Sequence, residues 1–484
     1  MRLESKLLMI DSMRSLVVPG SLLLVLTVTP SCSDTSDSAK ASTELVPVID
    51  VNPAVNIVEV NLVAGPGSTQ YLSAGLADIW GYREGSKTAS QAAIPGPLIT
   101  ANKGDRVVVH FRNDLPESTT LHWHGIRVPN MADGTPSTQK EVAPGESFDY
   151  EFTADDAGTF WYHPHVRGEI QLERGLYGML VVKENDGISV TNDRAFVLDD
   201  VKLESTGKLS TRTDALDLML GRQGNVLLVN GKVGPQIEVK SGARERWRFV
   251  NAANGRYFNL RLPGHKFTVI SWDGGLLPQP YEADTVLIAP GERYEVLVTV
   301  TRAVGALVDL VTIHYDRGHE IPDPGVLPLL TLKVGAAAPP PAALPATWGR
   351  SVDLEVPADA PTRTLVLQEE EPKEPGQEPK FFINNQRFPD VPSIDGKEGA
   401  VEIWSVKSDT EMDHPFHLHG MFFRVLDVDG VPPLHVGWKD TVNVPQKKTL
   451  RFAVRYGAPG VWMYHCHILE HAERGMMGEL RLSP

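Results

Sequence analysis

The sequence predicts an all-β protein made of tandem β-sandwich domains. Glycine and proline are abundant, with 42 and 37 copies among 484 residues, which is typical of chains with many turns. Helical periodicity is absent over long stretches, except for a short helix expected after "HCH" at 465–467. A chain of this length has room for about three domains, each with its own core.

Short runs rich in β-forming residues support this fold class. Examples are "GDRVVVHFRNDL" (104–115), "TVLIAPGERYEVLVTV" (285–300) and "RFAVRY" (451–456). Each run is bounded by Gly, Pro, Asn or Asp, so each is expected to form strands that end in turns.

Three similar blocks indicate an internal repeat. They are "KGDRVVVHFRND" from Lys103, "SGARERWRFVNAAN" from Ser241 and "EGAVEIWSVKSDTEMDHPFHLHG" from Glu398. Each is a glycine-led turn into a strand, and a spacing of roughly 140 to 160 residues fits sandwich domains better than a solenoid.

Composition sets the expected boundaries. A Pro/Ala-rich stretch, "GAAAPPPAALPATWG", separates the second and third blocks, and "EEEPKEPGQEPK" (369–380) is expected to be an exposed loop. We therefore expect domains at 46–186, 187–335 and 359–484, with a linker at 336–358.

The N-terminal residues 1–31 are expected to form an export signal. The apolar run Leu16–Thr29 contains Pro19 and is too short for a comfortable membrane span, and either Met1 or Met13 fits as the start. Cys32 is either incidental to a plain secretory signal or the lipid-bearing cysteine of a lipoprotein. Residues 32–45 are small and polar, as in a flexible tether. We therefore expect an exported protein of the periplasm or cell envelope.

The formal net charge is -15. Because nucleic acid is itself a polyanion and no basic patch stands out, we expect no nucleic-acid partner.

Ten of the fifteen histidines fall into four clusters, each with an H-x-H pair. Residues i and i+2 of a strand share one face, so each pair offers two imidazoles on one side. The clusters occur only in the first and third blocks, which predicts a site between those two domains; eight imidazoles suit three metal ions. The clusters are His122 and His124; His163 and His165; His414, His417 and His419; and His465, His467 and His471.

Cys466 lies between His465 and His467. If the two histidines face one metal site, the thiol faces the other side, where His414 and His471 can join it. A His₂Cys set with a weak thioether ligand is the blue-copper arrangement, and Met476 is the expected axial ligand, with Met477 a weaker candidate.

These motifs resemble those of multicopper oxidases of the three-domain bacterial laccase and cuprous oxidase type. The resemblance covers residues 45–484 and includes "HWHGIRVPNMADGTP", "GTFWYHPH" and "GWKDTVNVP". It implies three Greek-key cupredoxin domains, the middle one without copper, and four copper ions in the other two. The implied ligands are His414, Cys466, His471 and Met476 for type 1 copper; His122 and His417 for type 2; and His124, His163, His165, His419, His465 and His467 for the type 3 pair.

The resemblance also implies the reaction. A monomer would couple four one-electron oxidations of a small reductant to reduction of O₂ to water, with Cys466, His465 and His467 carrying electrons between the copper sites. Asp133, in the "DG" after the first histidine pair, would supply protons. Many bacterial members have a glutamate directly after the last type 1 histidine, whereas this chain has Ala472 there and Glu473 one residue later.

Three alternatives remain for the function. Oxidation of phenols and aromatic amines is the first expectation. Oxidation of Cu(I) is the second, since Met412 matches a methionine near the surface copper of cuprous oxidases, although no Met-rich insert is present. The third is a copper-free cupredoxin-repeat scaffold, which the complete set of ligand residues disfavours.

Overall fold

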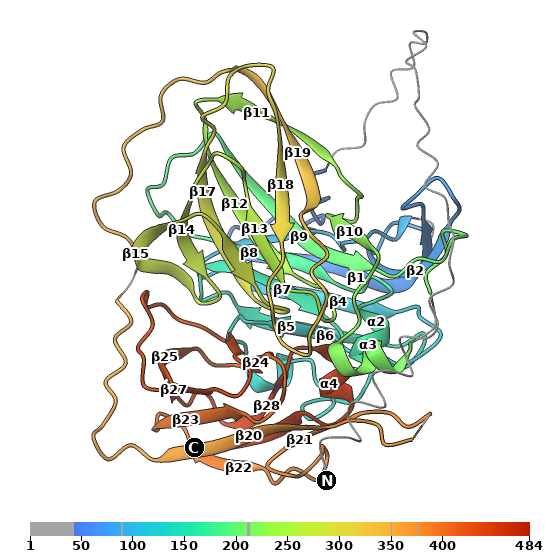
Figure 1. Ribbon diagram of the computed structural model, residues 1–484, viewed down its shortest axis with the longest axis vertical. Helices are drawn as coiled ribbons and strands as arrows, with labels where there is room; N and C mark the ends of the chain where they lie inside the picture. Colours follow the sequence, from blue (N-terminus) through green and yellow to red (C-terminus); the bar gives the residue numbers. More distant parts are fainter. Residues whose placement is uncertain (1–42, 89–90, 211–212, 350, 375) are drawn as a thin grey trace, which may run out of the picture. The chain divides into compact units, whose positions relative to one another are not determined.

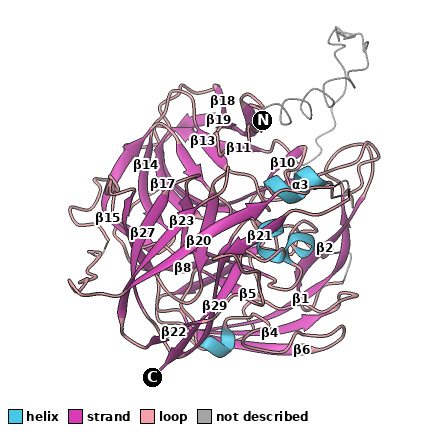
Figure 2. Cartoon of the chain, turned by 60° about the horizontal axis from the view of Figure 1, so that its bottom comes forward, coloured by secondary structure: helices cyan, strands magenta, loops and turns pink. Residues whose placement is uncertain are grey.

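The structure, a computed structural model, describes residues 43–88, 91–210, 213–349, 351–374 and 376–484. The strands form six β-sheets, and the helices among the described residues are short (Figure 2). Each pair of sheets comes from one continuous part of the chain, so the colours in Figure 1 pass from one pair to the next. The predicted all-β fold with three sandwiches is confirmed.

The first sandwich is built from eight strands. They are β1 (Ile57–Thr69), β2 (Ala77–Glu84), β3 (Ile99–Asn102), β4 (Arg106–Asn113), β5 (His122–His124), β6 (Ser147–Thr153), β7 (Gly158–His163) and β8 (Gly178–Lys183). One sheet has the order β2-β1-β4-β6 and the other the order β3-β8-β7-β5. Alternate residues such as Val107 and Val109 of β4 enter the core, where they meet Phe160 and Tyr162 of β7.

The second sandwich is built from eleven strands. They are β9 (Asn192–Val201), β10 (Val226–Val229), β11 (Gln236–Ser241), β12 (Arg244–Asn251), β13 (Phe258–Arg261), β14 (Phe267–Trp272), β15 (Gly275–Ala283), β16 (Val286–Ile288), β17 (Arg293–Thr299), β18 (Leu307–Ile313) and β19 (Leu327–Ala337). The sheets have the orders β10-β9-β12-β17-β14-β15 and β11-β19-β18-β13-β16. Trp247 and Phe249 of β12 lie in the core between them.

The third sandwich is built from ten strands. They are β20 (Thr362–Glu370), β21 (Lys380–Ile383), β22 (Ile394–Lys397), β23 (Val401–Ser408), β24 (His414–Leu418), β25 (Phe423–Val428), β26 (Thr441–Val444), β27 (Thr449–Arg455), β28 (Gly460–Cys466) and β29 (Met477–Ser483). The sheets have the orders β21-β20-β23-β27-β25 and β22-β29-β28-β24-β26. Their shared core contains Trp404, Phe416 and Tyr464.

The three glycine-led blocks lead into topologically equivalent strands, β4, β12 and β23. Each pairs in parallel with the first strand of its sandwich and antiparallel with a later one. The turns before them contain Gly104, Gly242 and Gly399 at φ of 91°, 80° and 77°, a conformation that side chains other than glycine rarely adopt.

Four short helices are present among the described residues: η2 (Asn130–Ala132), α2 (Gly168–Gln171), α3 (Ala215–Leu220) and α4 (Leu469–Glu473). The helix expected after "HCH" is α4, and it packs against both α2 and α3. It ends before Gly475, whose φ is 114° and whose absent Cβ would lie 2.9 Å from the backbone oxygen of Phe381. This close approach brings the chain back into the third sandwich at Met476.

The acidic stretch does connect β20 to β21 as an exposed loop, but Glu369 belongs to β20 and its side chain is only 8% exposed, because it faces His319. The export signal at 1–31 and Cys32 lie outside the described residues. Within the described part of the chain, no helix is long and apolar enough to cross a membrane.

Candidate metal centre

Eight histidines meet where the first and third sandwiches face each other. In the first sandwich, β5 pairs with β7 so that His122 is opposite His163. In the third, β24 pairs with β28 so that His417 is opposite His465. Rings from the two sandwiches then stack: the centroids of His122 and His419 lie 4.0 Å apart.

Three of the four H-x-H pairs extend beyond the end of a strand. Only His122 and His124 share one strand; β7 ends at His163, β24 at Leu418 and β28 at Cys466. The expectation of four pairs held within strands is therefore wrong for three of them, because strand pairing stops as the chain turns. The two rings of each pair are still neighbours, with centroids 4.8 to 6.4 Å apart.

The ring nitrogens converge in small groups. Nε2 of His465 lies 3.3 Å from Nε2 of His165 and 3.1 Å from Nε2 of His419. Nδ1 of His124 lies 3.4 Å from Nε2 of His163, and the His467 ring centroid lies 4.9 Å from that of His124. Such groups of buried nitrogens could hold metal ions, because nitrogens bound to the same ion lie at similar distances from one another.

His122, His417 and His467 have buried ring nitrogens with no hydrogen-bond partner among the described residues. These buried atoms are Nε2 of His122, Nε2 of His417 and both ring nitrogens of His467. Buried polar atoms are ordinarily paired, and His122 and His417 belong to one group of ligand atoms within 4.8 Å of one another, so their unpaired nitrogens indicate a site for a metal ion.

Backbone oxygens hold the outward nitrogens. Nδ1 of His122 donates to the oxygen of Asp133 at 2.7 Å, and Nδ1 of His417 to that of Asp440 at 3.0 Å. Nδ1 of His465 donates to the oxygen of Cys466 at 2.9 Å. Each bond fixes the ring with Nε2 pointing inward, which is how ligand histidines are usually oriented.

Asp133 contacts two of these rings. It follows η2, is 1% exposed, and places Oδ2 3.0 Å from Nδ1 of His419 while its backbone oxygen holds His122. Its carboxylate therefore lies beside the histidine group, as its sequence motif suggested.

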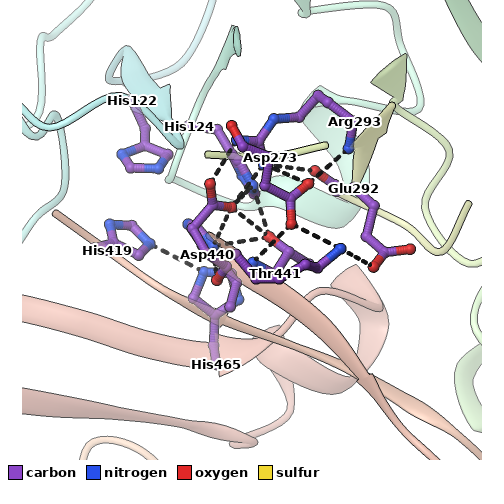
Figure 3. A network of polar contacts seen from close by, with 12 residues as sticks. His122, His124, Asp273, Glu292, Arg293, His419, Asp440, Thr441 and His465 are labelled. Carbon is purple, nitrogen blue, oxygen red and sulfur yellow. Dashed lines mark hydrogen bonds and ion pairs between the residues drawn. The ribbon is translucent and has the colours of Figure 1, made fainter. Parts of the chain in front are cut away.

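Asp440 and Thr441 were not predicted as site residues, although both belong to the quoted motif "GWKDTVNVP". The hydroxyl of Thr441 lies 3.0 Å from Nε2 of His124 and from Nδ1 of His417. Asp440 in turn binds Arg293 of the second sandwich, and Figure 3 shows this network beside the imidazoles. The motif was a usable signal; Arg293, 147 residues away from Asp440, had none.

Cys466 belongs to a second group. Its Sγ lies 3.4 Å from Nδ1 of His414 and 3.7 Å from Nδ1 of His471, and those nitrogens are 3.3 Å apart. All three side chains are fully buried. Met476 is equally buried in the same core cluster as Cys466, whereas Met477 lines a cavity beside the other histidine group.

Burial shapes the ionisation of both groups. Together with neighbouring rings it lowers the pKa of His465 and His467 well below the usual range for imidazole, and burial lowers that of His165 to about 3. Burial also lowers the pKa of His414 to about 4 and raises that of the Cys466 thiol. Lowered pKa values favour the neutral imidazole, the form that binds metal, in the rings just named, and the raised pKa of the thiol means that it needs a bound cation to ionise.

A cavity of about 310 Å³ reaches the histidine group from outside. His163, His165 and His465 line it, together with Arg167 and Glu473. Oε1 of Glu473 accepts a hydrogen bond from the backbone nitrogen of Gly168 at 2.5 Å, and burial raises the pKa of this carboxyl group. Glu473 thus lies on an access route despite its one-residue shift in the sequence.

The two groups define a class of site: a buried centre of one thiol and two imidazoles, joined by one strand, β28, to a larger histidine centre. Models of one protein family match the parts of the chain that contain these two groups. Multicopper oxidase family models match residues 80–187, 199–309 and 355–484. The chain belongs to the multicopper oxidase family; it is an oxidoreductase that uses O₂ and a reducing substrate, and its cofactor is copper.

Individual relatives cover most of the chain. The multicopper oxidase MmcO of Mycobacterium tuberculosis is 32% identical over 80% of this chain and 81% of its own. A Bacillus subtilis laccase is 27% identical over 82% of this chain and 89% of its own. A Campylobacter jejuni multicopper oxidase structure, described as a metallo-oxidase, has a TM-score of 0.82 and 28% identity over 91% of this chain and 94% of its own.

Proposed function

We propose that this protein couples the one-electron oxidation of phenols or aromatic amines to the four-electron reduction of O₂ to water. The observation that carries the proposal is the position of Cys466. Its sulfur joins His414 and His471, while its neighbour His465 belongs to the other histidine group. Two consecutive residues therefore belong to the centre that would accept electrons and to the centre that would use them.

Copper fits the donor set. A buried thiol with two imidazoles suits a soft, trigonal copper site, and imidazole alone suits the remaining ions. We assign type 1 copper to His414, Cys466, His471 and Met476; type 2 to His122 and His417; and the type 3 pair to His124, His163 and His467 on one side and His165, His419 and His465 on the other. Bound copper would supply the one-electron acceptor and the oxygen-binding centre.

The chain's own groups would support this chemistry by orientation and proton supply. Asp133, Thr441 and the backbone oxygens hold the rings in place, and burial keeps bulk water from the Cys466 centre. The second sandwich would remain without copper, since no group of three potential ligands occurs within its described residues.

Replacement of Cys466 by serine tests the proposal. A serine oxygen cannot give the intense absorption of a copper thiolate, so Cys466→Ser should lose the blue colour and nearly all oxidase activity while retaining most of its trinuclear copper. Cys32→Ser makes the same chemical change at the other cysteine and should keep the colour. A blue Cys466→Ser protein would contradict the assignment.

Oxidation of Cu(I) is the second candidate. Met219 and Met412 lie in the same buried cluster as Cys466, and thioethers are soft ligands suited to Cu(I). The metallo-oxidase described for Campylobacter jejuni favours the same candidate. Comparing turnover of Cu(I) with turnover of a phenol, and repeating the phenol assay with added copper, distinguishes the two. A colourless, copper-free purified protein would instead support the scaffold alternative.

We further infer a monomer that is exported to the periplasm or cell envelope. A lipid on Cys32 would hold it at a membrane, since lipoproteins carry more than one acyl chain. Mass spectrometry of the mature N-terminus separates this from a plain secretory signal, because an unmodified terminus excludes the lipid.

A further inference from the structure

Neither imidazole of the Cys466 group reaches the protein surface. His414 and His471 are both 0% exposed. Nε2 of His471 donates to the backbone oxygen of Met219 at 3.0 Å, and Nε2 of His414 lies 2.8 Å from the hydroxyl of Thr410. An aromatic reductant therefore cannot touch either ring in this structure, and its electron has to cross another residue first.

A cavity of about 540 Å³ in the second sandwich offers a place from which this transfer could start. Its apolar lining includes Val226, Leu227, Ile321, Pro322 and Leu327. This volume is in the range of pockets that bind small organic molecules.

Two tyrosines line the cavity and connect it to the Cys466 group. The rings of Tyr257 and Tyr315 are stacked, with centroids 5.6 Å apart. The hydroxyl of Tyr315 donates to Oδ2 of Asp413 at 2.6 Å, and Asp413 directly precedes His414. One hydrogen bond and one residue of chain thus connect the cavity wall to a ligand of the proposed type 1 site.

The charged residues that line the cavity are basic, although the chain carries a net charge of -15. Its described lining contains Arg256, Arg317 and His314 and no Asp or Glu. Asp200 pairs with Arg256, and Oδ1 of Asp323 lies 3.9 Å from Nδ1 of His314, which leaves Arg317 as the basic group available to a ligand. Arg317 has no carboxylate partner among the described residues; it donates to the oxygen of Leu220, and its buried Nη1 has no hydrogen-bond partner there.

We propose that this cavity binds aromatic reductants that carry a carboxylate, with the ring against the tyrosines and the carboxylate toward Arg317, and that Tyr315 conducts the electron toward His414. The inference rests on the proposed oxidase function and specifies its substrate. Each phenol loses one electron through Tyr315 and one proton to water. Four phenols and one O₂ give four phenoxyl radicals and two waters, so atoms and electrons balance.

Binding of a compound that cannot be oxidised tests the docking site directly. We expect 3,4-dimethoxybenzoate to bind the copper-loaded protein, measured by calorimetry, at least about tenfold more tightly than its methyl ester, because an ion pair to arginine is lost in the ester. Ile321→Trp should fill the cavity and weaken binding at least about tenfold. Val304→Trp, which adds the same side chain at an exposed site of the second sandwich, should not.

Electron transfer has a separate test. Tyr315→Phe keeps the ring but loses the hydrogen bond to Asp413, so single-turnover reduction of the blue centre by 4-hydroxy-3-methoxybenzoate should slow while binding of 3,4-dimethoxybenzoate is unchanged. Equal binding of acid and ester, or unchanged binding to Ile321→Trp, would overturn the docking site. A parental reduction rate in Tyr315→Phe would overturn the electron path. A parent protein without blue colour would instead refute the proposed function.

Discussion

The guanidinium of Arg293 makes two hydrogen bonds, of 2.6 and 2.5 Å, to the carboxylate of Asp440, and neither side chain is more than 2% exposed. Arg293 also donates to the backbone oxygen of Thr159, so one residue joins all three sandwiches. Burial opposes ionisation of Asp440, yet Arg293 holds its pKa below the usual value. This pair positions the histidine group, since the backbone oxygen of Asp440 holds His417.

Replacing Arg293 by methionine should therefore have two effects. Breaking a buried ion pair by removing one partner costs about 3–5 kcal/mol of stability. Because Asp440 loses its fixed position, we also expect copper to be lost from the trinuclear centre while the blue band remains. Arg302→Met, at an exposed arginine of the same sandwich, should change neither the unfolding midpoint nor the copper content. A fully copper-loaded Arg293→Met protein would rule out the positioning role.

Met476 and Met477 offer a matched pair of variants. If Met476 is the axial ligand, its thioether stabilises Cu(II), and Met476→Leu should raise the reduction potential of the blue centre. Met477→Leu should leave the potential unchanged, because that side chain lines the cavity beside His465. A Met-to-Leu exchange usually costs less than about 1.5 kcal/mol, so both proteins should fold. The reverse pattern in a redox titration would assign the axial position to Met477.

The histidine groups were accessible to sequence analysis because they depend on local spacing. H-x-H and H-C-H place imidazoles and the thiol within a few residues, and the structure brings those residues into two buried groups. The supporting contacts depend instead on packing between sandwiches. Arg293 lies 147 residues from Asp440 and Met219 lies 252 residues from His471, and no local pattern marks Arg293 or Met219 as a partner.

The difference between local sequence patterns and packing between distant residues also explains where the predicted strands differ from the observed ones. Alternation predicted strands such as β4 and β27 correctly, because alternate side chains face the core. It did not reveal that β7 and β28 end within their histidine motifs, since strand ends depend on where pairing partners stop. The burial of the Glu369 side chain likewise depends on its contact with His319, 50 residues away.

Glu295 should give the protein part of its acid sensitivity. It is 1% exposed and accepts hydrogen bonds from Arg246, Arg248 and Thr159. Although burial opposes ionisation, the two arginines hold its pKa at about 2, below the ordinary 4.5. Stability from this group is present above pH 4.5 and is lost as pH falls toward 2, by about 3 kcal/mol in total.

Urea unfolding followed by tryptophan fluorescence between pH 2 and 6 tests this. Glu295→Gln cannot ionise, so its unfolding midpoint should be lower at pH 6 and should fall less steeply on acidification than that of the parent. Glu238→Gln removes an exposed carboxylate of the same sandwich and should follow the parent curve. Parallel pH profiles for parent and Glu295→Gln would show that other groups dominate.

Asp133 is the last group to test, because making water from O₂ consumes four protons beside rings that cannot release theirs easily. Its Oδ2 lies 3.0 Å from Nδ1 of His419, and an asparagine oxygen could accept the same hydrogen bond without being able to carry a proton. Asp133→Asn should therefore keep its copper, its blue colour and its reduction by substrate, but be reoxidised by O₂ about 10²-fold more slowly. Glu473→Gln is the comparison, because Glu473 is a buried carboxyl group that lines the 310 Å³ cavity together with His165 and His465. If Asp133 is the main proton donor, Glu473→Gln should slow reoxidation less. Stopped-flow mixing of each fully reduced variant with O₂ measures both rates, and reoxidation of Asp133→Asn at the parental rate would leave Asp133 with a purely orienting role.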